Sequence, residues 1–238
     1  MVGAFYSSSS TQMPAFPQQI AAVRAGCPDP TLLGTFTECH DVPRMAYYTN
    51  DLAILKNVNV WNILWDGIPV VYQGQEQRFR GNSDPYNREA VWLSGYSTNS
   101  TLYVLIKFLN CKSVIPPALI LAFRKAMIKH DSDYVTTLST TLFSDYETIA
   151  FLKKDVMMVL TNSGTQSSQY AVTIPLKSTS LKSSSGTEFT DIISCNKAKI
   201  TSTGDFVTTI SKGMPQVCSL TIFHLTERYG FRRQLCQK

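Results

Sequence analysis

A cluster of ionisable side chains, Glu38, His40, Asp41 and Arg44, directly follows an apolar segment that begins at Leu32. A carboxylate beside an imidazole can perform acid–base chemistry, and a guanidinium can hold a carboxylate in place. Such groups are costly to bury unless they pair with one another or take part in chemistry. The cluster is therefore the first candidate for a functional site, although an isolated His–Asp pair is more often structural than catalytic.

The segment before this cluster predicts a buried strand. Residues 32–36 form an apolar run bounded by Pro30 and Pro43, which is typical of a strand covered on both faces. In an α/β barrel the active site is built at the C-terminal ends of the strands. The ionisable cluster would lie at such an end.

The composition is that of a globular protein. The chain has 238 residues, of which 44% are hydrophobic and 16% charged, and its net charge is +5. This length allows one minimal barrel or two modest domains. The basic residues are scattered, so we expect no nucleic acid partner. No apolar run reaches membrane-spanning length, so we expect no membrane partner either.

The cysteines and the N-terminus bear on the cellular compartment. None of the six cysteines forms a CxxC pair or a zinc-finger spacing, so we expect no metal site. Cys195 and Cys236 bracket the last expected strands and could form a disulfide, although spacing alone does not give the pairing. The many Ser and Thr residues fit a secreted chain, but the first residues do not form a signal peptide. Asn99 begins an Asn-Ser-Thr sequon, a glycosylation candidate only if the chain is secreted.

The periodicity changes near residue 130. Before it, we expect a helix over 18–25, the strand at 32–36, a helix from Thr49 or Asn50 to Gly67, and a strand over 68–72. Thr49 or Asn50 would cap the longer helix, which is apolar on so much of its surface that we expect it to pack between layers. Strand, helix and strand in this order predict a parallel crossover. A long polar loop over 75–95 and a helix over 101–108 follow.

After residue 130, short β-rich runs alternate with turns, which predicts a small antiparallel sandwich. The expected strands cover 148–152, 157–160, 170–174, 189–193, 199–201, 206–210 and 217–223. The fold class is therefore α/β followed by all-β.

Several of these segments resemble the α-amylases, glycoside hydrolase family 13, and in particular the secreted fungal ones. FTECHDVPR resembles that family's signature FVENHDNPR, and YYTNDLAILKNV, DGIPVVYQGQEQ and DPYNREAVWLSGY resemble further stretches in the same order. The resemblance is strong over 26–107 and weak over 134–238. It implies the C-terminal part of a (β/α)8 TIM barrel over 1–130, about its strands 7 and 8, and a small antiparallel β-sandwich domain over 131–238.

The resemblance also implies an activity and a set of site residues. The family performs retaining endo-hydrolysis of α-1,4-glucan (starch), which requires one carboxyl group as nucleophile and another as general acid. By resemblance, Asp41 is a third carboxylate that stabilises the transition state. His40, Asp84 and Arg88 would bind the substrate, an α-glucan, and we expect the chain to be a monomer.

The departures from the family matter as much as the matches. The motifs of the nucleophile, the general acid and the calcium ligands lie upstream of the matched region in the family, so we expect this chain alone to be inactive and to bind no calcium. Cys39 and Val42 replace polar residues of the signature, and Cys27 resembles a cysteine whose partner would lie upstream. Residues 111–123, CKSVIPPALILAF, resemble an insertion into the last barrel helix.

Other interpretations of these residues remain open. Glu38 could be a general acid, but strand alternation puts it on the same face as His40 and favours an orienting role. Asp84 and Arg88 could simply pair across a loop turn. Among the tryptophans, Trp61 and Trp65 have core spacing, whereas Trp92 could stack on sugar.

Two other functions are also possible. One is a non-catalytic glucan-binding or vestigial amylase-like protein. The other is a related transglycosylase or α-glucosidase, against which the DPYNREAVWLSGY stretch counts.

Overall fold

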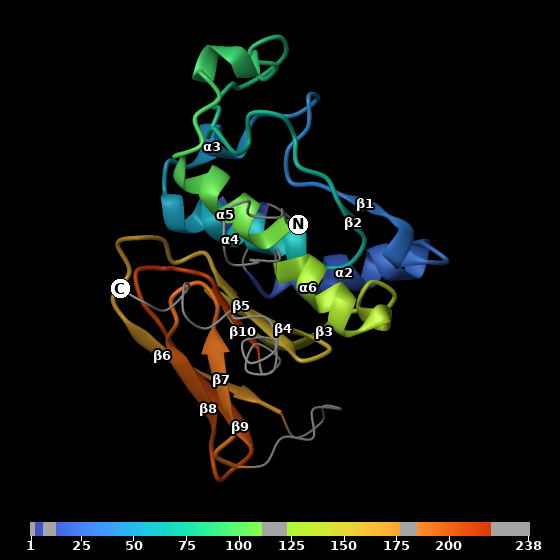
Figure 1. Ribbon diagram of the computed structural model, residues 1–238, viewed down its shortest axis with the longest axis vertical. Helices are drawn as coiled ribbons and strands as arrows, with labels where there is room; N and C mark the ends of the chain where they lie inside the picture. The colour runs from blue at the N-terminus through green and yellow to red at the C-terminus, as the bar shows by residue number, and fades with distance from the viewer. Residues whose placement is uncertain (1–2, 7–12, 111–122, 177–184, 220–238) are drawn as a thin grey trace, which may run out of the picture.

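A computed structural model describes residues 3–6, 13–110, 123–176 and 185–219 of the chain. The helices of the first half lie together at one end of the molecule, and an antiparallel sheet lies at the other end (Figure 1). The predicted order of an α/β part followed by an all-β part is confirmed.

The first half contains two short strands among helices and 3-10 turns. Its elements are α1 (Gly3–Tyr6), α2 (Ala15–Gly26), η1 (Pro30–Leu32), β1 (Gly34–Thr35), α3 (Met45–Tyr48), α4 (Leu52–Leu64), β2 (Ile68–Pro69), η2 (Val91–Ser94), α5 (Thr101–Asn110), α6 (Phe123–His130) and η3 (Ser132–Tyr134). Strands β1 and β2 pair in parallel, with Gly34 opposite Ile68. The predicted strand–helix–strand unit is therefore present, although both strands are shorter than expected.

The prediction that these two strands are buried on both faces is wrong. The side chains of Leu32, Phe36 and Ile68 are 71%, 51% and 56% exposed. Among the described residues, β1 and β2 pair only with each other. Their outer edges have no partner there, so apolar side chains that a full sheet would cover remain in solvent.

Helix α4 is the central element of the fold. Oδ1 of Asp51 accepts the N–H groups of Ala53 and Ile54 at 2.8 and 3.2 Å, which caps the helix. The predicted caps, Thr49 or Asn50, are wrong, because the Thr49 hydroxyl instead accepts the N–H of Asp51. Most residues of α4 are buried, and the helix contacts α5 and strand β5 (Val156–Thr161). This confirms the prediction that it packs between layers.

Aromatic packing joins α2 to α4. Trp61 and Trp65 are buried, and their stacked rings have centroids 5.2 Å apart. Phe16 of α2 meets the Trp61 ring edge-on at 5.3 Å. Large aromatic side chains dominate the energetics of a core, so these contacts hold α2 against α4. The prediction that both tryptophans serve packing is confirmed.

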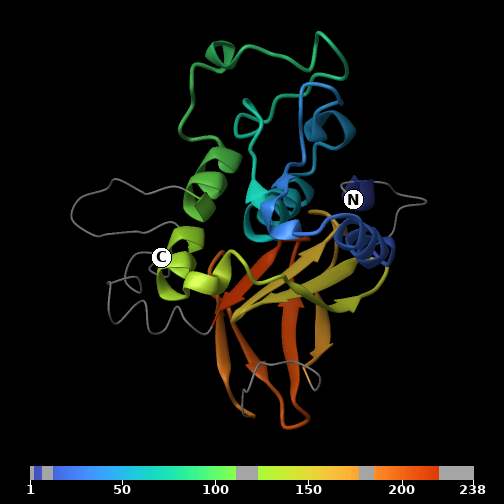
Figure 2. The same cartoon turned by 90° about the vertical axis from the view of Figure 1, so that its right-hand side faces the viewer.

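The second half forms a single antiparallel sheet. Its strands are β3 (Thr140–Ser144), β4 (Thr148–Lys153), β5, β6 (Tyr170–Pro175), β7 (Glu188–Asp191), β8 (Lys197–Ile200), β9 (Asp205–Ile210) and β10 (Gln216–Ser219). Their order is β3-β4-β5-β10-β7-β8-β9-β6. The two outermost strands, β3 and β6, contact each other, so the sheet curls over on itself. Figure 2 shows this curled sheet below the helices.

Strands β4 and β5 are buried on both faces because each face belongs to a different core. One face packs against the rest of the curled sheet, through Ala150, Leu152, Met157 and Val159. The other face packs against the helices, through Ile149, Phe151, Val156, Met158 and Leu160. Strand β6 lies away from the helices, and its buried Val172 and Ile174 alternate with exposed residues.

A buried ion cluster fastens the two halves together. The Asp66 carboxylate, just after α4, meets Nη2 of Arg24 at 2.6 Å and Nζ of Lys153 at 3.0 Å. It also accepts the backbone N–H of Ser139 at 2.9 Å. Arg124 of α6 donates to two backbone carbonyls around the end of α4. Asp66 pairs with two of these cations, and backbone carbonyl groups accept from the third, so the cluster can lie at the junction.

Two expectations fall on residues outside the described part of the chain. The proposed insertion covers 111–123, of which only Phe123, the first residue of α6, is described. Cys236 also lies outside it. Over the ranges that the structure does cover, we find no helix long and apolar enough to cross a membrane.

Candidate functional site

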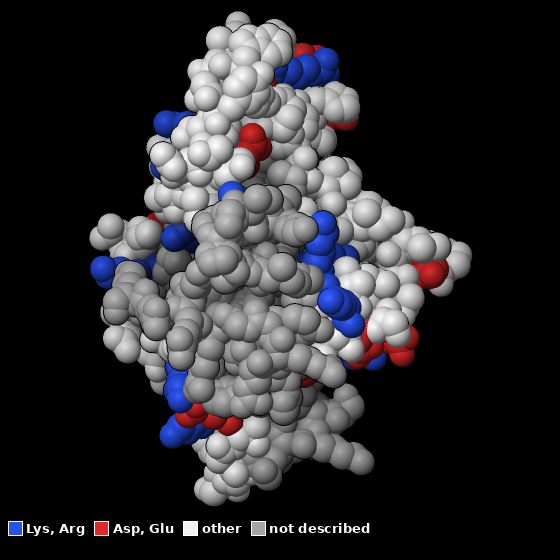
Figure 3. Space-filling model, viewed as in Figure 1, with Lys and Arg blue, Asp and Glu red and all other residues white. Residues whose placement is uncertain are grey.

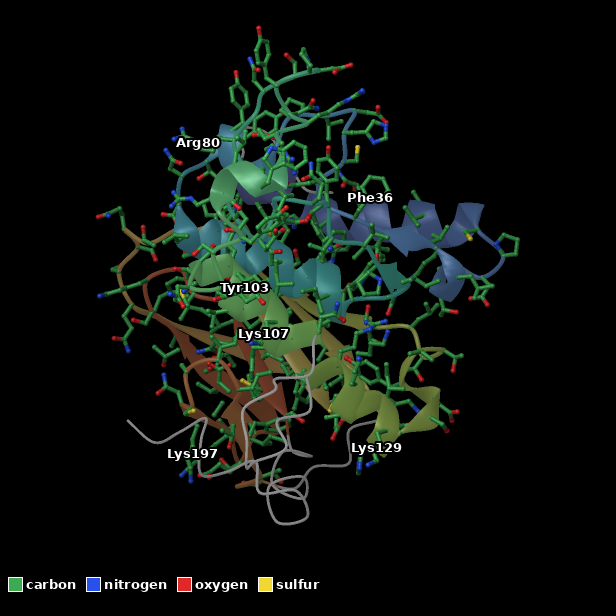
Figure 4. All side chains as sticks on the ribbon, turned by 45° about the horizontal axis from the view of Figure 1, so that its top comes forward. Phe36, Arg80, Tyr103, Lys107, Lys129 and Lys197 are labelled. Atoms are coloured by element: carbon green, nitrogen blue, oxygen red, sulfur yellow. The ribbon has the colours of Figure 1, made fainter. Side chains whose placement is uncertain are left out.

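The candidate site is formed by two loops, residues 36–44 after β1 and residues 70–90 after β2. Because β1 and β2 run parallel, both loops begin at the same end of the small sheet, where the two strands end. Figure 2 shows them at the end of the molecule away from the curled sheet. Figure 4 shows Phe36 and Arg80, one from each loop, at this end, while Lys197 of β8 lies at the opposite end.

His40 and Asp41 form an exposed pair in the first loop. Nε2 of His40 lies 3.1 Å from Oδ1 of Asp41, and the two side chains are 59% and 69% exposed. A polar contact this exposed adds little to stability. Both side chains are therefore free to contact a ligand.

Asp84 and Arg88 form a second exposed pair in the other loop. Nη2 of Arg88 lies 3.1 Å from Oδ2 of Asp84, four residues earlier in the chain. The alternative of pairing across a turn is thus observed, and the substrate role remains a prediction. Nε of Arg88 also reaches the His40 carbonyl oxygen at 3.4 Å. The structure therefore brings the four predicted site residues into one cluster.

Asn87 connects the two loops directly. Its side chain is buried, and Nδ2 donates to the carbonyl oxygens of His40 and Val42, both at 2.9 Å. These two carbonyl groups lie immediately before and after Asp41. Sequence reasoning missed Asn87, although it stands beside Arg88 in the DPYNR segment; its burial is not visible in the sequence.

Arg44 lies fully buried behind the exposed pairs. Its Nη1 donates to the Gln73 carbonyl oxygen at 2.7 Å and approaches Glu38 at 3.3 Å. Its Nε meets the Glu89 carboxylate at 3.0 Å. The guanidinium stacks over the Tyr72 ring, 4.0 Å from its centroid. Arg44 thus ties the first loop to two points of the second, and its two acidic partners compensate its buried charge.

Glu38 occupies an interior position rather than the face of the site. Its carboxylate accepts the Met45 N–H at 3.2 Å and faces Arg44. Burial raises the pKa of Glu38 to about 7, although the nearby Arg44 charge opposes this shift. That pKa would suit a general acid, but the carboxyl group is almost fully enclosed. The contacts favour the orienting role.

The expectation that Glu38 and His40 share one face is wrong. Glu38 is buried and His40 is exposed. Two-residue alternation holds only in an extended strand, and β1 ends at Thr35. The segment after it is a loop, so its side chains follow local hydrogen bonds instead.

The remaining candidates lie away from this cluster or outside the described residues. Trp92 of η2 is 68% exposed and stays a candidate sugar platform. Asn99 is exposed just before α5, as a glycosylation acceptor requires. Cys27, Cys39 and Cys218 are free thiols, and Cys195 is not among them. On the face drawn in Figure 3, Lys and Arg form small separate groups, several of them beside acidic residues.

The described residues offer no donor set for a metal ion. No group of three or more His, Cys, Asp and Glu side chains with suitable geometry occurs within those ranges. The expectation that this chain binds no calcium stays a prediction. No chemical step is assigned to calcium.

Comparison with known proteins agrees with the geometry. The family model for the catalytic domain of α-amylase matches residues 4–132, and that for α-amylase domain C matches residues 141–222. Over 217 residues the chain is 36% identical to alpha-amylase 2 and 39% identical to alpha-amylase 1 of Schwanniomyces occidentalis. Each alignment includes 90% of this chain and 39% of the relative.

A solved structure gives the same result in three dimensions. The α-amylase of Malbranchea cinnamomea superposes with a TM-score of 0.82 at 40% identity, over 93% of this chain and 44% of that one. The chain thus spans less than half the length of these relatives. It belongs to the α-amylase family of glycoside hydrolases, with a stretch of the catalytic domain followed by domain C.

Proposed function

We propose that this chain carries part of the α-glucan-binding cleft of a retaining starch hydrolase, including the carboxylate that stabilises its transition state. The observation that carries the proposal is the convergence of His40, Asp41, Asp84 and Arg88 on one exposed loop cluster. All four side chains are exposed, so hydrogen-bond donors and acceptors face solvent together.

Each of the four side chains has a defined role in this proposal. Asp41 stabilises the positive charge that develops on the sugar ring as the glycosidic bond breaks. His40 donates a hydrogen bond to a hydroxyl group of the same sugar. Asp84 accepts hydrogen bonds from the hydroxyl groups of a neighbouring glucose unit. The planar guanidinium of Arg88 donates hydrogen bonds to the hydroxyl groups of the same unit.

We further propose that the isolated chain does not hydrolyse starch. Retaining hydrolysis needs a nucleophile and a general acid about 5 Å apart. The two carboxylates behind Asp41 are the buried Glu38 and the partly buried Glu89, and Arg44 engages both of them. Neither is free to attack a sugar. A non-catalytic glucan-binding protein is the second candidate, since the exposed cluster could serve binding without cleavage.

Several properties of the parent enzyme follow as parts of the same proposal. We propose that it is extracellular and that Cys195 pairs with Cys236, which is supported by the absence of Cys195 from the free cysteines of the described residues. We also propose a monomer that binds starch oligosaccharides, and neither nucleic acid nor membrane. The exposure of Asn99 supports glycosylation there.

The test is to assay reducing-sugar release from starch by the purified 238-residue chain, with Asp41→Asn as control. We expect no activity above the control, together with measurable binding of maltoheptaose that Asp41→Asn weakens. Starch hydrolysis that disappears in Asp41→Asn would overturn the inactive-fragment account. Absence of any maltoheptaose binding would overturn the glucan-binding account.

A further inference from the structure

The side-chain amide of Asn87 holds the backbone on both sides of Asp41. Its two N–H groups are used by two acceptors, the carbonyl oxygens of His40 and Val42, both at 2.9 Å. Its Oδ1 is buried without a hydrogen-bond partner among the described residues. The amide therefore acts through donation alone, and its target is the two carbonyl groups that flank Asp41.

Asn87 is itself fixed within the other half of the cluster. It lies between Asp84 and Arg88, and its backbone N–H donates to the Ser83 carbonyl oxygen at 2.9 Å. Gly81 permits this turn to close, because a Cβ at that position would lie 1.8 Å from the carbonyl oxygen of Tyr86. Through Asn87, the turn that carries Asp84 and Arg88 is thus hydrogen-bonded to the loop around Asp41.

A second anchor lies behind the turn. The Arg44 N–H donates to the Gly81 carbonyl oxygen at 3.0 Å. Oε1 of Glu89 accepts the N–H of Arg80 at 2.9 Å and also that of Gly81, while its Oε2 meets Arg44 at 3.0 Å. The two loops therefore share hydrogen bonds in front, through Asn87, and behind, through Arg44.

We propose that Asn87 is a positioning residue that sets the placement of Asp41 relative to Asp84 and Arg88, with Arg44 as the rear anchor. This inference rests on the proposed glucan-binding function. A sugar chain that contacts both pairs needs them at a fixed separation, and sites of this kind tolerate displacements of only about 0.5 Å. Asn87 contacts no sugar in this arrangement and acts through Asp41.

The experiment measures maltoheptaose affinity by calorimetry for the full 238-residue chain and for Asn87→Ala. Asn82→Ala is the matched control, because Asn82 is an exposed amide in the same loop. We expect Asn87→Ala to weaken binding about tenfold, because Asp41 loses its fixed placement relative to Arg88, and Asn82→Ala to leave it unchanged. Asn87→Ser retains one hydrogen-bond donor, so its affinity for maltoheptaose should fall less than that of Asn87→Ala. Equal affinity of Asn87→Ala and the unmodified chain would overturn the proposal.

A double-mutant cycle separates positioning from general destabilisation. If Asn87 acts through Asp41, then adding Asn87→Ala to Asp41→Asn should weaken binding little beyond Asp41→Asn alone. Fully additive losses would contradict the proposal. Should Asn87→Ala fail to fold, the isosteric Asn87→Asp replaces it in the cycle, since its carboxylate fits the space but cannot donate to the carbonyl groups.

A ligand-free measurement keeps the inference separate from the proposed function. Amide hydrogen exchange at Arg44 reports its hydrogen bond to the Gly81 carbonyl oxygen in the other loop, and exchange at Gly81 reports its hydrogen bond to Glu89, the carboxylate that also meets Arg44. Asn87→Ala should speed exchange at both amides, whereas Asn82→Ala should not. If the unmodified chain binds no maltoheptaose, the proposed function fails, and this exchange comparison alone decides whether Asn87 holds the loops together. Unchanged exchange in Asn87→Ala would overturn the inference.

Discussion

Glu38→Gln removes a buried carboxyl group from behind the candidate site. Burial raises the pKa of Glu38 from 4.5 to about 7 in the folded chain. The folded state therefore binds this proton more tightly than the unfolded state does. Stability from the protonated group is fully present below about pH 4.5 and is lost as the pH rises through 7.

The size of the effect follows from the two pKa values. The difference between 4.5 and about 7 corresponds to about 3 kcal/mol of unfolding free energy across that range. Glutamine is neutral at every pH and keeps an oxygen that can accept the Met45 N–H. Glu38→Gln should therefore lack this dependence while it preserves much of the local hydrogen bonding.

The assay is urea unfolding from about pH 4 to about pH 8, with Glu147→Gln as the matched control at an exposed carboxyl group. Histidine titrations are common to all three proteins and cancel in the difference. We expect the unmodified chain to lose about 3 kcal/mol relative to Glu38→Gln as the pH rises, and Glu147→Gln to follow the unmodified chain. Parallel curves for the unmodified chain and Glu38→Gln would refute the reasoning that Glu38 is buried and compensated only in part by Arg44.

Three further predictions concern the junction, a turn and the surface. Asp66→Ala leaves the buried Lys153 and the partly buried Arg24 without their carboxylate and should cost about 3–5 kcal/mol in urea unfolding; a loss below about 1 kcal/mol would contradict it. Gly213→Ala places a Cβ 2.3 Å from the Gly164 carbonyl oxygen at a positive φ, so its melting temperature should fall by several degrees, whereas the open Gly26→Ala should not lower it. Asn99→Gln should remove one glycan mass from chain secreted by a eukaryotic host, and identical masses would count against glycosylation there.

The helical pattern was sufficient to predict α4 and its place between two layers. Apolar residues on most of its surface indicated burial on several sides, and the structure confirms this. Its cap was missed because Thr49, Asn50 and Asp51 are all good capping residues. Only the path of the chain after α3 decides that the Asp51 carboxylate accepts the N–H of Ala53 and that the Thr49 hydroxyl accepts the N–H of Asp51.

The strands were predicted in position more reliably than in burial. Apolar runs marked β4 and β5, and the alternation over 170–174 marked β6. Strand β3 was missed because its sequence, TTLFS, is short and mostly polar. The exposure of β1 and β2 depends on which neighbours are present in space, and a single strand's sequence does not contain that information.

At the site, residue types and their order identified the exposed side chains but not the buried residue that positions them. His40, Asp41, Asp84 and Arg88 were found through the segments that resemble the family. Asn87 was missed because its function depends on two backbone carbonyl groups, which every residue has. Contacts between a side chain and the backbone of a distant loop leave no mark in a local sequence pattern.

The most direct test of the central claim is an NMR titration of the 238-residue chain with maltoheptaose. The account predicts that the largest shift changes fall on the amides of residues 38–44 and 84–89, and that Asp41→Asn and Arg88→Ala reduce them. Changes confined to the strands of the curled sheet, or no changes at all, would contradict the claim that these two loops form part of a glucan-binding cleft.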